Sequence, residues 1–222
     1  MFIMLRIDDY ATFRRVATPF YYYDIDLFMS TVDKVADLSE KTGIQVHYSV
    51  KANSDSRLND IISYKGLGAD CVSGDEIEFA VGCGYDPRKI FFAGVGKSDR
   101  EICQAFQVGI GAFVVESLEE IEIIGDLACR LGRRAPVSLR INPNIDAHTH
   151  HYITTGLYED KFGISDRSFD EAVALVNACP NIDFYGLQFH IGQPDGSAFR
   201  GVVLATQSVQ TCPRRVLGKV EQ

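Results

Sequence analysis

A regular alternation of β-type runs with amphipathic helical segments limits the fold of this chain more than any other feature. Each run is rich in β-branched and aromatic residues, and the segment after it carries apolar residues at helical spacing. The runs lie near positions 46, 69, 90, 112, 136 and 182. Strands that alternate with helices are usually parallel and joined by right-handed crossovers. The sequence therefore predicts a parallel α/β sheet.

Four of the helical segments open with Ser-x-x-Glu, at Ser73, Ser98, Ser117 and Ser168. This pattern is typical of the reciprocal capping box, in which serine and glutamate each accept an otherwise unpaired backbone amide. Its recurrence directly after β-type runs supports the predicted strand–helix order.

Two further elements are predicted ahead of this alternation. The aromatic run at 20–23 favours a short strand. Phe28, Val32 and Val35 then follow at helical spacing, and Gly43 is suited to end that helix.

Six parallel strands fit either an open doubly wound sheet or three quarters of an eight-stranded barrel. A dinucleotide-binding sheet would carry Gly-x-Gly-x-x-Gly after its first strand, and no such pattern follows the run at 46–50. We therefore predict an α/β fold that is an incomplete (β/α)8 TIM barrel of about six βα units.

Composition excludes several classes of partner. The chain has 222 residues, 46% of them hydrophobic, which is enough for one substantial core. Its formal net charge of −8 disfavours binding to nucleic acid or to an anionic membrane surface. No apolar run reaches the roughly 18 residues that span a bilayer, and the apolar start at 1–5 is too short for a secretory signal. The six cysteines form no Cys-x-x-Cys pair or zinc spacing, which favours a reduced, cytoplasmic protein.

Lys51 stands where the first strand of the alternation ends and a turn begins. One interpretation is a solvated lysine that closes a strand. The other is an amine partly desolvated in a cleft, with a lowered pKa, which could form a Schiff base with a carbonyl group. The strand alone leaves both interpretations open.

Three more polar residues, Asp70, Arg140 and His190, also fall at or near the carboxyl ends of their strands. In a barrel these ends converge on one mouth, the face on which barrel enzymes place their chemistry. An amine, a carboxylate, a guanidinium and an imidazole at one mouth would suit a phosphorylated, carbonyl-bearing cofactor. Taken singly, each residue has an ordinary structural explanation, such as a turn acid, a salt bridge or a buried core histidine.

A second candidate site is the long loop between Asn142 and Ser168, which holds His148, His150 and His151. Loops of this length inside compact domains are usually functional or disordered. The histidines lack an acidic ligand pattern and a helical His-x-x-x-His spacing, and a loop is a poor scaffold for catalytic zinc. We favour a solvated loop over a metal site and predict no bound metal.

Five motifs in order resemble the fold-type III pyridoxal-phosphate-dependent decarboxylases, the ornithine/diaminopimelate/arginine decarboxylase group, and within it the diaminopimelate branch. They are HYSVKAN at 47–53, GADCVSG at 68–74, RINP at 140–143, TG at 155–156 with KFGI at 161–164, and GLQFHIG at 186–192. The resemblance covers roughly residues 17–193. It implies an alanine-racemase-like barrel that binds pyridoxal 5'-phosphate.

The resemblance also implies roles for the residues at the strand ends. Lys51 would bind pyridoxal phosphate as a Schiff base, and His190 would stack on the pyridine ring. Arg140 would lie beside the ring and Asp70 near the Schiff base. Lys51 and His190 would be catalytic, and all four would bind the cofactor. The implied activity is that of a carboxy-lyase that converts meso-2,6-diaminopimelate to L-lysine in lysine biosynthesis, with a homodimer expected for the full-length family.

The family pattern departs from this chain after Gly192, where the family has Ser-Gln and this chain has Gln193-Pro194. That serine helps to hold the cofactor phosphate in the family. We expect three parts: a segment at 1–24 that would belong to a β-domain, a partial pyridoxal-phosphate-binding barrel at 25–193, and a divergent tail at 194–222. The resemblance then implies a truncated form without the C-terminal β-domain and with weak or no activity.

Three alternatives remain open at this point. The first is a non-catalytic pyridoxal-phosphate-binding protein built on the same barrel. The second is a decarboxylase of another basic amino acid, of the ornithine or arginine type. The third is a metal-dependent hydrolase that uses the loop histidines.

Overall fold

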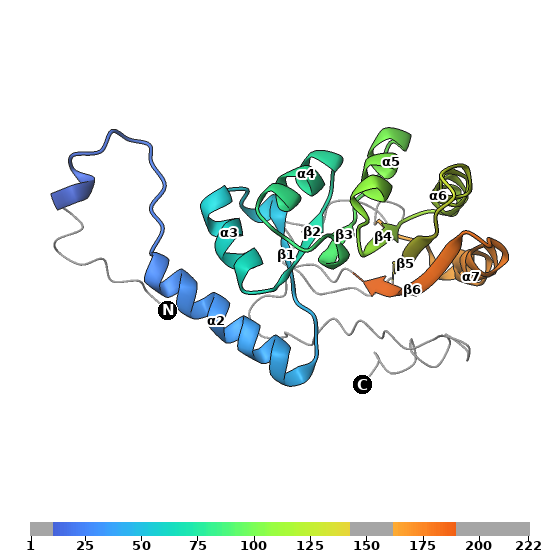
Figure 1. The fold of residues 1–222 in the computed structure, drawn as a ribbon, viewed down its shortest axis with the longest axis horizontal. Coiled ribbons are helices and arrows are strands. Elements are labelled where there is room, and N and C mark those ends of the chain that lie inside the picture. The colour runs from blue at the N-terminus through green and yellow to red at the C-terminus, as the bar shows by residue number, and fades with distance from the viewer. Residues whose placement is uncertain (1–10, 143–161, 190–222) are drawn as a thin grey trace, which may run out of the picture.

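A single parallel sheet forms the centre of the computed structural model, which describes residues 11–142 and 162–189 (Figure 1). Six strands make up the sheet: β1 (His47–Ser49), β2 (Gly68–Cys71), β3 (Ile90–Phe92), β4 (Ala112–Val115), β5 (Ala135–Ile141) and β6 (Ile182–Phe189). The helices are α2 (Ile25–Thr42), α3 (Ser56–Tyr64), α4 (Gly74–Gly82), α5 (Asp99–Val108), α6 (Leu118–Arg130) and α7 (Phe169–Ala178). The predicted strand–helix alternation is confirmed.

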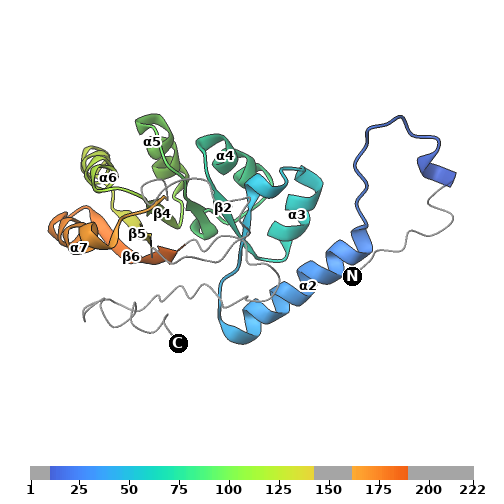
Figure 2. The ribbon, with the colours of Figure 1, turned by 180° about the vertical axis from the view of Figure 1, so that it is seen from behind.

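The strand order decides between the two predicted architectures. It follows the chain, β1-β2-β3-β4-β5-β6, and every neighbouring pair is parallel. In a doubly wound sheet the strand order reverses part-way through the chain, and helices cover both faces of the sheet. In this structure α3 to α7 lie in a row along one face of the sheet (Figures 1 and 2). The winding is that of an incomplete (β/α)8 barrel, as predicted.

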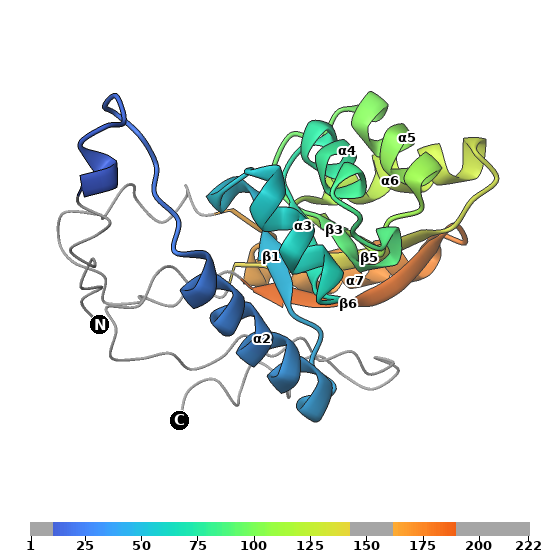
Figure 3. The ribbon, with the colours of Figure 1, turned by 60° about the vertical axis from the view of Figure 1, so that its left-hand side comes forward.

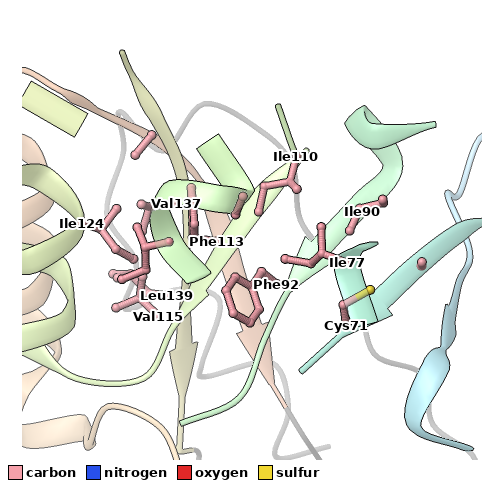
Figure 4. Packing of buried hydrophobic residues seen from close by; sticks show 14 of the residues in the cluster. Cys71, Ile77, Ile90, Phe92, Ile110, Phe113, Val115, Ile124, Val137 and Leu139 are labelled. Atoms are coloured by element: carbon pink, nitrogen blue, oxygen red, sulfur yellow. The ribbon is translucent and has the colours of Figure 1, made fainter. Parts of the chain in front are cut away.

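The alternation of side chains along each strand separates two apolar layers. Ala69, Cys71, Phe92 and Phe113 belong to the main core between sheet and helices, shown in part in Figure 4. Phe91, Ala93, Ala112 and Val114 form a second, smaller cluster. The second cluster therefore lies on the opposite face of the strands, the inner face of the barrel.

Aromatic rings from three strands meet on that inner face. The ring centroid of Phe91 in β3 lies 4.2 Å from that of His47 in β1 and 5.5 Å from that of Tyr185 in β6. A contact between β3 and β6 requires the sheet to curve, because three strand positions separate them in the strand order. The sheet therefore bends toward closure.

One of the four predicted capping boxes is confirmed in full. Ser98 accepts the amide of Glu101, and the Glu101 carboxylate accepts the amide of Ser98. Ser73 and Ser117 also cap their helices. However, the glutamates three residues later bind an amide one position earlier, those of Val72 and Glu116.

The fourth predicted capping box, at Ser168, is wrong. A 3-10 turn, η3 (Asp166–Ser168), precedes α7, and Ser165 accepts the amide of Ser168. Ser168 makes no side-chain cap of its own. The tight turn brings the Ser168 amide to Ser165, so the cap lies three residues earlier than the sequence pattern predicts.

The amino-terminal predictions have different outcomes. The helix is confirmed as α2, which ends at Gly43 with a φ of +69°, a conformation that glycine adopts without strain. It lies outside the row formed by α3 to α7 (Figure 3), and its Asp33 forms an ion pair with Lys65, which caps the end of α3. The strand predicted at 20–23 is wrong, because these residues pair with no strand among the described residues, and an extended segment without a partner is not a β-strand.

No helix in the described ranges is long and apolar enough to cross a membrane.

Candidate functional site

Lys51 lies on a 3-10 turn, η1 (Val50–Ala52), directly after β1. The strand is therefore shorter than predicted, and the lysine begins the loop instead of ending the strand. Val50 is completely buried in the core, whereas Lys51 is exposed. Buried Val50 thus anchors the backbone of the turn, while the side-chain amine of Lys51 remains accessible.

Asp70 lies beside this turn, on the neighbouring strand. It pairs in register with Ser49, whose Oγ donates a hydrogen bond to Asp70 Oδ2 at 3.1 Å. Burial raises the pKa of Asp70, while the Ser49 hydrogen bond and the positive charges of Lys51 and Arg140 act in the opposite direction. Asp70 therefore lies within electrostatic reach of both cations, and three of the four residues singled out from the sequence share one region of the structure.

Arg140, near the end of β5, is held by a buried ion pair. Its Nη1 donates to Glu116 Oε1 at 2.7 Å, and the two side chains are 13% and 4% exposed. The same Glu116 oxygen accepts the Gly94 amide at 3.1 Å. The ring of Phe162 adds a cation–π contact, with the guanidinium carbon 5.6 Å from the ring centroid. The guanidinium is therefore fixed before any ligand binds.

Glu116 was not among the candidate residues chosen from the sequence. It directly follows β4, and Asp70 and Arg140 likewise lie near the carboxyl ends of β2 and β5. Its second oxygen, Oε2, is buried and has no hydrogen-bond partner among the described residues. A buried carboxylate oxygen without a partner is costly, so such groups usually mark an unfilled polar site. The signal that could have identified Glu116 was its position at the carboxyl end of a strand in a barrel.

The motif KFGI docks its described part against the end of β5. The Ile164 amide donates to the Arg140 carbonyl at 2.8 Å, and the Asn142 amide donates to the Ile164 carbonyl at 2.9 Å. Gly163 between them has a φ of +103°, and an added Cβ would lie only 3.0 Å from the Arg140 carbonyl oxygen. Glycine permits this close approach, which brings Phe162 over Arg140.

The raised pKa of Asp70 predicts a pH-dependent stability. Because the folded-state pKa lies above the ordinary value of 3.8, the contribution of Asp70 is most favourable below pH 3.8 and is lost as the pH rises through the folded-state pKa. Asp70→Asn should therefore raise the free energy of unfolding more at neutral pH than below pH 3.8. Urea unfolding of both proteins at the two pH values measures this difference, and an equal effect at both would contradict it.

Other predicted residues fall outside the described ranges. These are His190, the loop histidines His148, His150 and His151, and the segment at 194–222. Within the described residues, no group of three histidine, cysteine or acidic side chains could hold a metal ion. Lys51, Asp70 and Arg140 are thus the sequence-predicted residues that the structure brings together.

The side chains at this site fit a phosphorylated aldehyde. An exposed primary amine can condense with a carbonyl group, and a guanidinium held in place by Glu116 is suited to an anionic group. Asp70, partly buried and within electrostatic reach of Lys51 and Arg140, can interact with a cationic atom of the ligand. The chemistry of this donor set is compatible with pyridoxal phosphate.

Comparison with known protein families shows to which family this chain belongs. Residues 29–212 match the model of the pyridoxal-binding domain of pyridoxal-dependent decarboxylases, which is most of the chain. The chain belongs to this family. The match runs past Gln193, where the resemblance by motifs ends. The family binds pyridoxal phosphate, in agreement with the predicted cofactor.

Individual members of this decarboxylase family are also similar to this chain in sequence and structure. A diaminopimelate decarboxylase of Bacteroides thetaiotaomicron is 46% identical over 181 residues, which is 81% of this chain and 47% of that protein. The crystal structure of the Helicobacter pylori diaminopimelate decarboxylase in complex with L-lysine superposes with a TM-score of 0.73 at 39% identity, over 83% of this chain and 47% of that one. The L-lysine complex of the diaminopimelate decarboxylase from M. jannaschii superposes with a TM-score of 0.65 at 32% identity, over 74% of this chain and 40% of that one. The chain spans less than half the length of these relatives.

Proposed function

We propose that this chain provides the cofactor-binding barrel of a pyridoxal-phosphate-dependent decarboxylase that converts meso-2,6-diaminopimelate to L-lysine. The observation that carries the proposal is the meeting of Lys51, Asp70 and Arg140 at the carboxyl ends of three strands in a chain of this family. The identity of 46% to a diaminopimelate decarboxylase supports the substrate. A homodimer and a cytoplasmic location belong to the same proposal.

In this proposal, the roles of the described residues follow from their positions. Lys51 would hold the cofactor through its amine, which is exposed on a turn anchored by buried Val50. Arg140, fixed by Glu116, would orient an anionic or aromatic part of the ligand. Asp70 would face the positive charge near the reacting atoms. His190 would stack on the cofactor ring, as the family resemblance implies.

Pyridoxal phosphate, when bound, supplies an aromatic system that accepts the electrons left when a carboxylate departs as CO₂. The protein contributes orientation. The fixed positions of Asp70 and Arg140 would set the angle of the ligand relative to Lys51, because Asp70 accepts a hydrogen bond from Ser49 and Arg140 donates one to Glu116. The exposed amine of Lys51, when free, would also be able to donate a proton to the ligand or accept one from it.

Reductive labelling tests the cofactor site directly. The protein is incubated with pyridoxal phosphate, the adduct is reduced with borohydride, and the labelled peptide is identified by mass spectrometry. We expect the label on Lys51 and its loss in Lys51→Arg, because arginine keeps the charge but cannot condense with the aldehyde.

Lys89→Arg serves as the matched control. Lys89 precedes β3, at the amino end of the strands, and its Nζ donates to the Gly66 carbonyl at 2.7 Å. Lys89 thus lies at the end of the sheet opposite to Lys51. Labelling should persist in Lys89→Arg, whereas label spread over many lysines, or retained in Lys51→Arg, would overturn the assignment of Lys51.

The substrate assignment needs a separate assay. Purified protein with pyridoxal phosphate is given meso-diaminopimelate, ornithine or arginine in turn, and the amine products are measured by chromatography. We expect L-lysine from meso-diaminopimelate and much less product from the other two. Product from ornithine or arginine alone would replace the proposed substrate while leaving the cofactor site intact.

A further inference from the structure

We propose that Asn59 and Tyr85 are positioning residues that hold the turn carrying Lys51 in the conformation needed for its amine to react. This inference rests on the proposed role of Lys51. Neither residue is one of the candidate site residues Lys51, Asp70 and Arg140. Asn59 lies on α3, and Tyr85 lies in the segment after α4. Their side chains are buried, with 0% and 2% of the residue exposed.

Asn59 is an unusual residue to bury in a helix, because an amide without partners loses free energy on leaving water. Its hydrogen bonds explain its presence. Nδ2 donates to the Asn53 carbonyl at 3.0 Å and to the Asp55 carbonyl at 2.9 Å. Oδ1 accepts a hydrogen bond from the Tyr85 hydroxyl at 3.0 Å. Both amide protons are therefore used, and both point to the segment directly after Lys51.

The restrained segment is the one that closes the lysine turn. The Asn53 amide donates to the Val50 carbonyl at 3.2 Å, which is the hydrogen bond that ends η1. The Asn53 side chain donates to the Tyr23 hydroxyl at 2.9 Å and accepts the Asp55 amide at 2.9 Å. Asn59 thus fixes the residue that ends the 3-10 turn, two positions after Lys51.

Tyr85 fixes Asn59 in turn. With its hydroxyl donating to Oδ1, the Asn59 amide group is held with its two protons toward the Asn53 and Asp55 carbonyls. Burial raises the pKa of Tyr85, so the hydroxyl remains a donor throughout the neutral range. The chain of contacts runs from Tyr85 through Asn59 to Asn53 and the backbone of the lysine turn.

Two single variants and their combination test this proposal. Tyr85→Phe removes only the hydroxyl, and Asn59→Leu replaces the amide by an apolar side chain of similar length. We expect each to slow borohydride-trapped labelling of Lys51 by pyridoxal phosphate by about fivefold to tenfold, which corresponds to the loss of one or two hydrogen bonds. Amide hydrogen exchange at Asn53 and Asp55, measured without cofactor, should become faster in both.

The double variant Asn59→Leu/Tyr85→Phe separates positioning from stability. Replacing both partners of a buried hydrogen bond by apolar groups is often nearly neutral for stability. We therefore expect the double variant to recover the unfolding midpoint of the parent while its labelling of Lys51 remains slow. Recovery of both stability and labelling rate would show a structural role only and would overturn the proposal.

Ser63→Ala is the matched control. Ser63 lies on the same helix, and its Oγ donates to the Cys83 carbonyl, so it also links α3 to the end of α4 without contacting the lysine turn. Labelling should be unchanged in this variant. If the parent itself shows no label on Lys51, the proposed function fails, and unchanged exchange at Asn53 and Asp55 in Asn59→Leu would independently remove the positioning role.

Discussion

Replacing Glu120 by glutamine should lower the free energy of unfolding by about 3–5 kcal/mol, because it leaves the charge of Lys97 buried without its counter-ion. The Lys97 side chain is 0% exposed, and its Nζ lies 2.6 Å from Glu120 Oε1. Nζ also donates to the carbonyls of Gly94 and Val114, at 2.6 and 2.8 Å. These contacts join the loop after β3 to β4 and α6. Urea denaturation followed by circular dichroism measures the loss.

A double-mutant cycle isolates the pair. Lys97→Met/Glu120→Gln removes both charges, so its destabilisation should be clearly smaller than the sum of the two single losses. Arg88→Ala provides a surface comparison, because Arg88 is 84% exposed in its ion pair with Asp86. Water screens that pair, and its removal should have a far smaller effect. Additive losses in the cycle, or equal losses at both pairs, would contradict a dominant buried charge interaction.

Gly111→Ala should also destabilise the protein, by about 1–3 kcal/mol, because there is no room for a methyl group. A Cβ at this position would lie 2.2 Å from the Arg88 carbonyl oxygen and 2.9 Å from its carbonyl carbon. Both are backbone atoms, so the contact cannot be relieved by rotating a side chain. The Gly111 amide donates to the Ile90 carbonyl at 2.9 Å, which holds the start of β4 against β3. The expected result is a lower urea midpoint.

Gly82→Ala is the matched control for this glycine. Gly82 is the last residue of α4, and nothing lies within 4 Å of the position that its Cβ would occupy. Alanine is the better helix former by up to about 1 kcal/mol, so this variant should be neutral or slightly more stable. If Gly111→Ala proved equally neutral, the approach of Arg88 to Gly111 would not be as close as the structure has it.

The sequence by itself determined the parts of this protein that depend on local patterns. Runs of β-branched and aromatic residues predict the strands, and the helical spacing ended by Gly43 predicts α2, because side-chain periodicity and backbone propensity act within a few residues. The placement of Lys51, Asp70 and Arg140 at strand ends also follows from the pattern, since the carboxyl ends of parallel strands lie at one edge of a sheet.

Only the tertiary structure decided how these residues are held. Glu116 meets Arg140 because β4 and β5 pair in a particular register, and Asn59 meets Tyr85 because α3 packs beside the end of α4. Such contacts join residues more than 20 positions apart, and no local pattern encodes the register or packing that creates them. The same reason explains the wrong strand at 20–23, whose aromatic residues favour β-structure but find no pairing strand among the described residues.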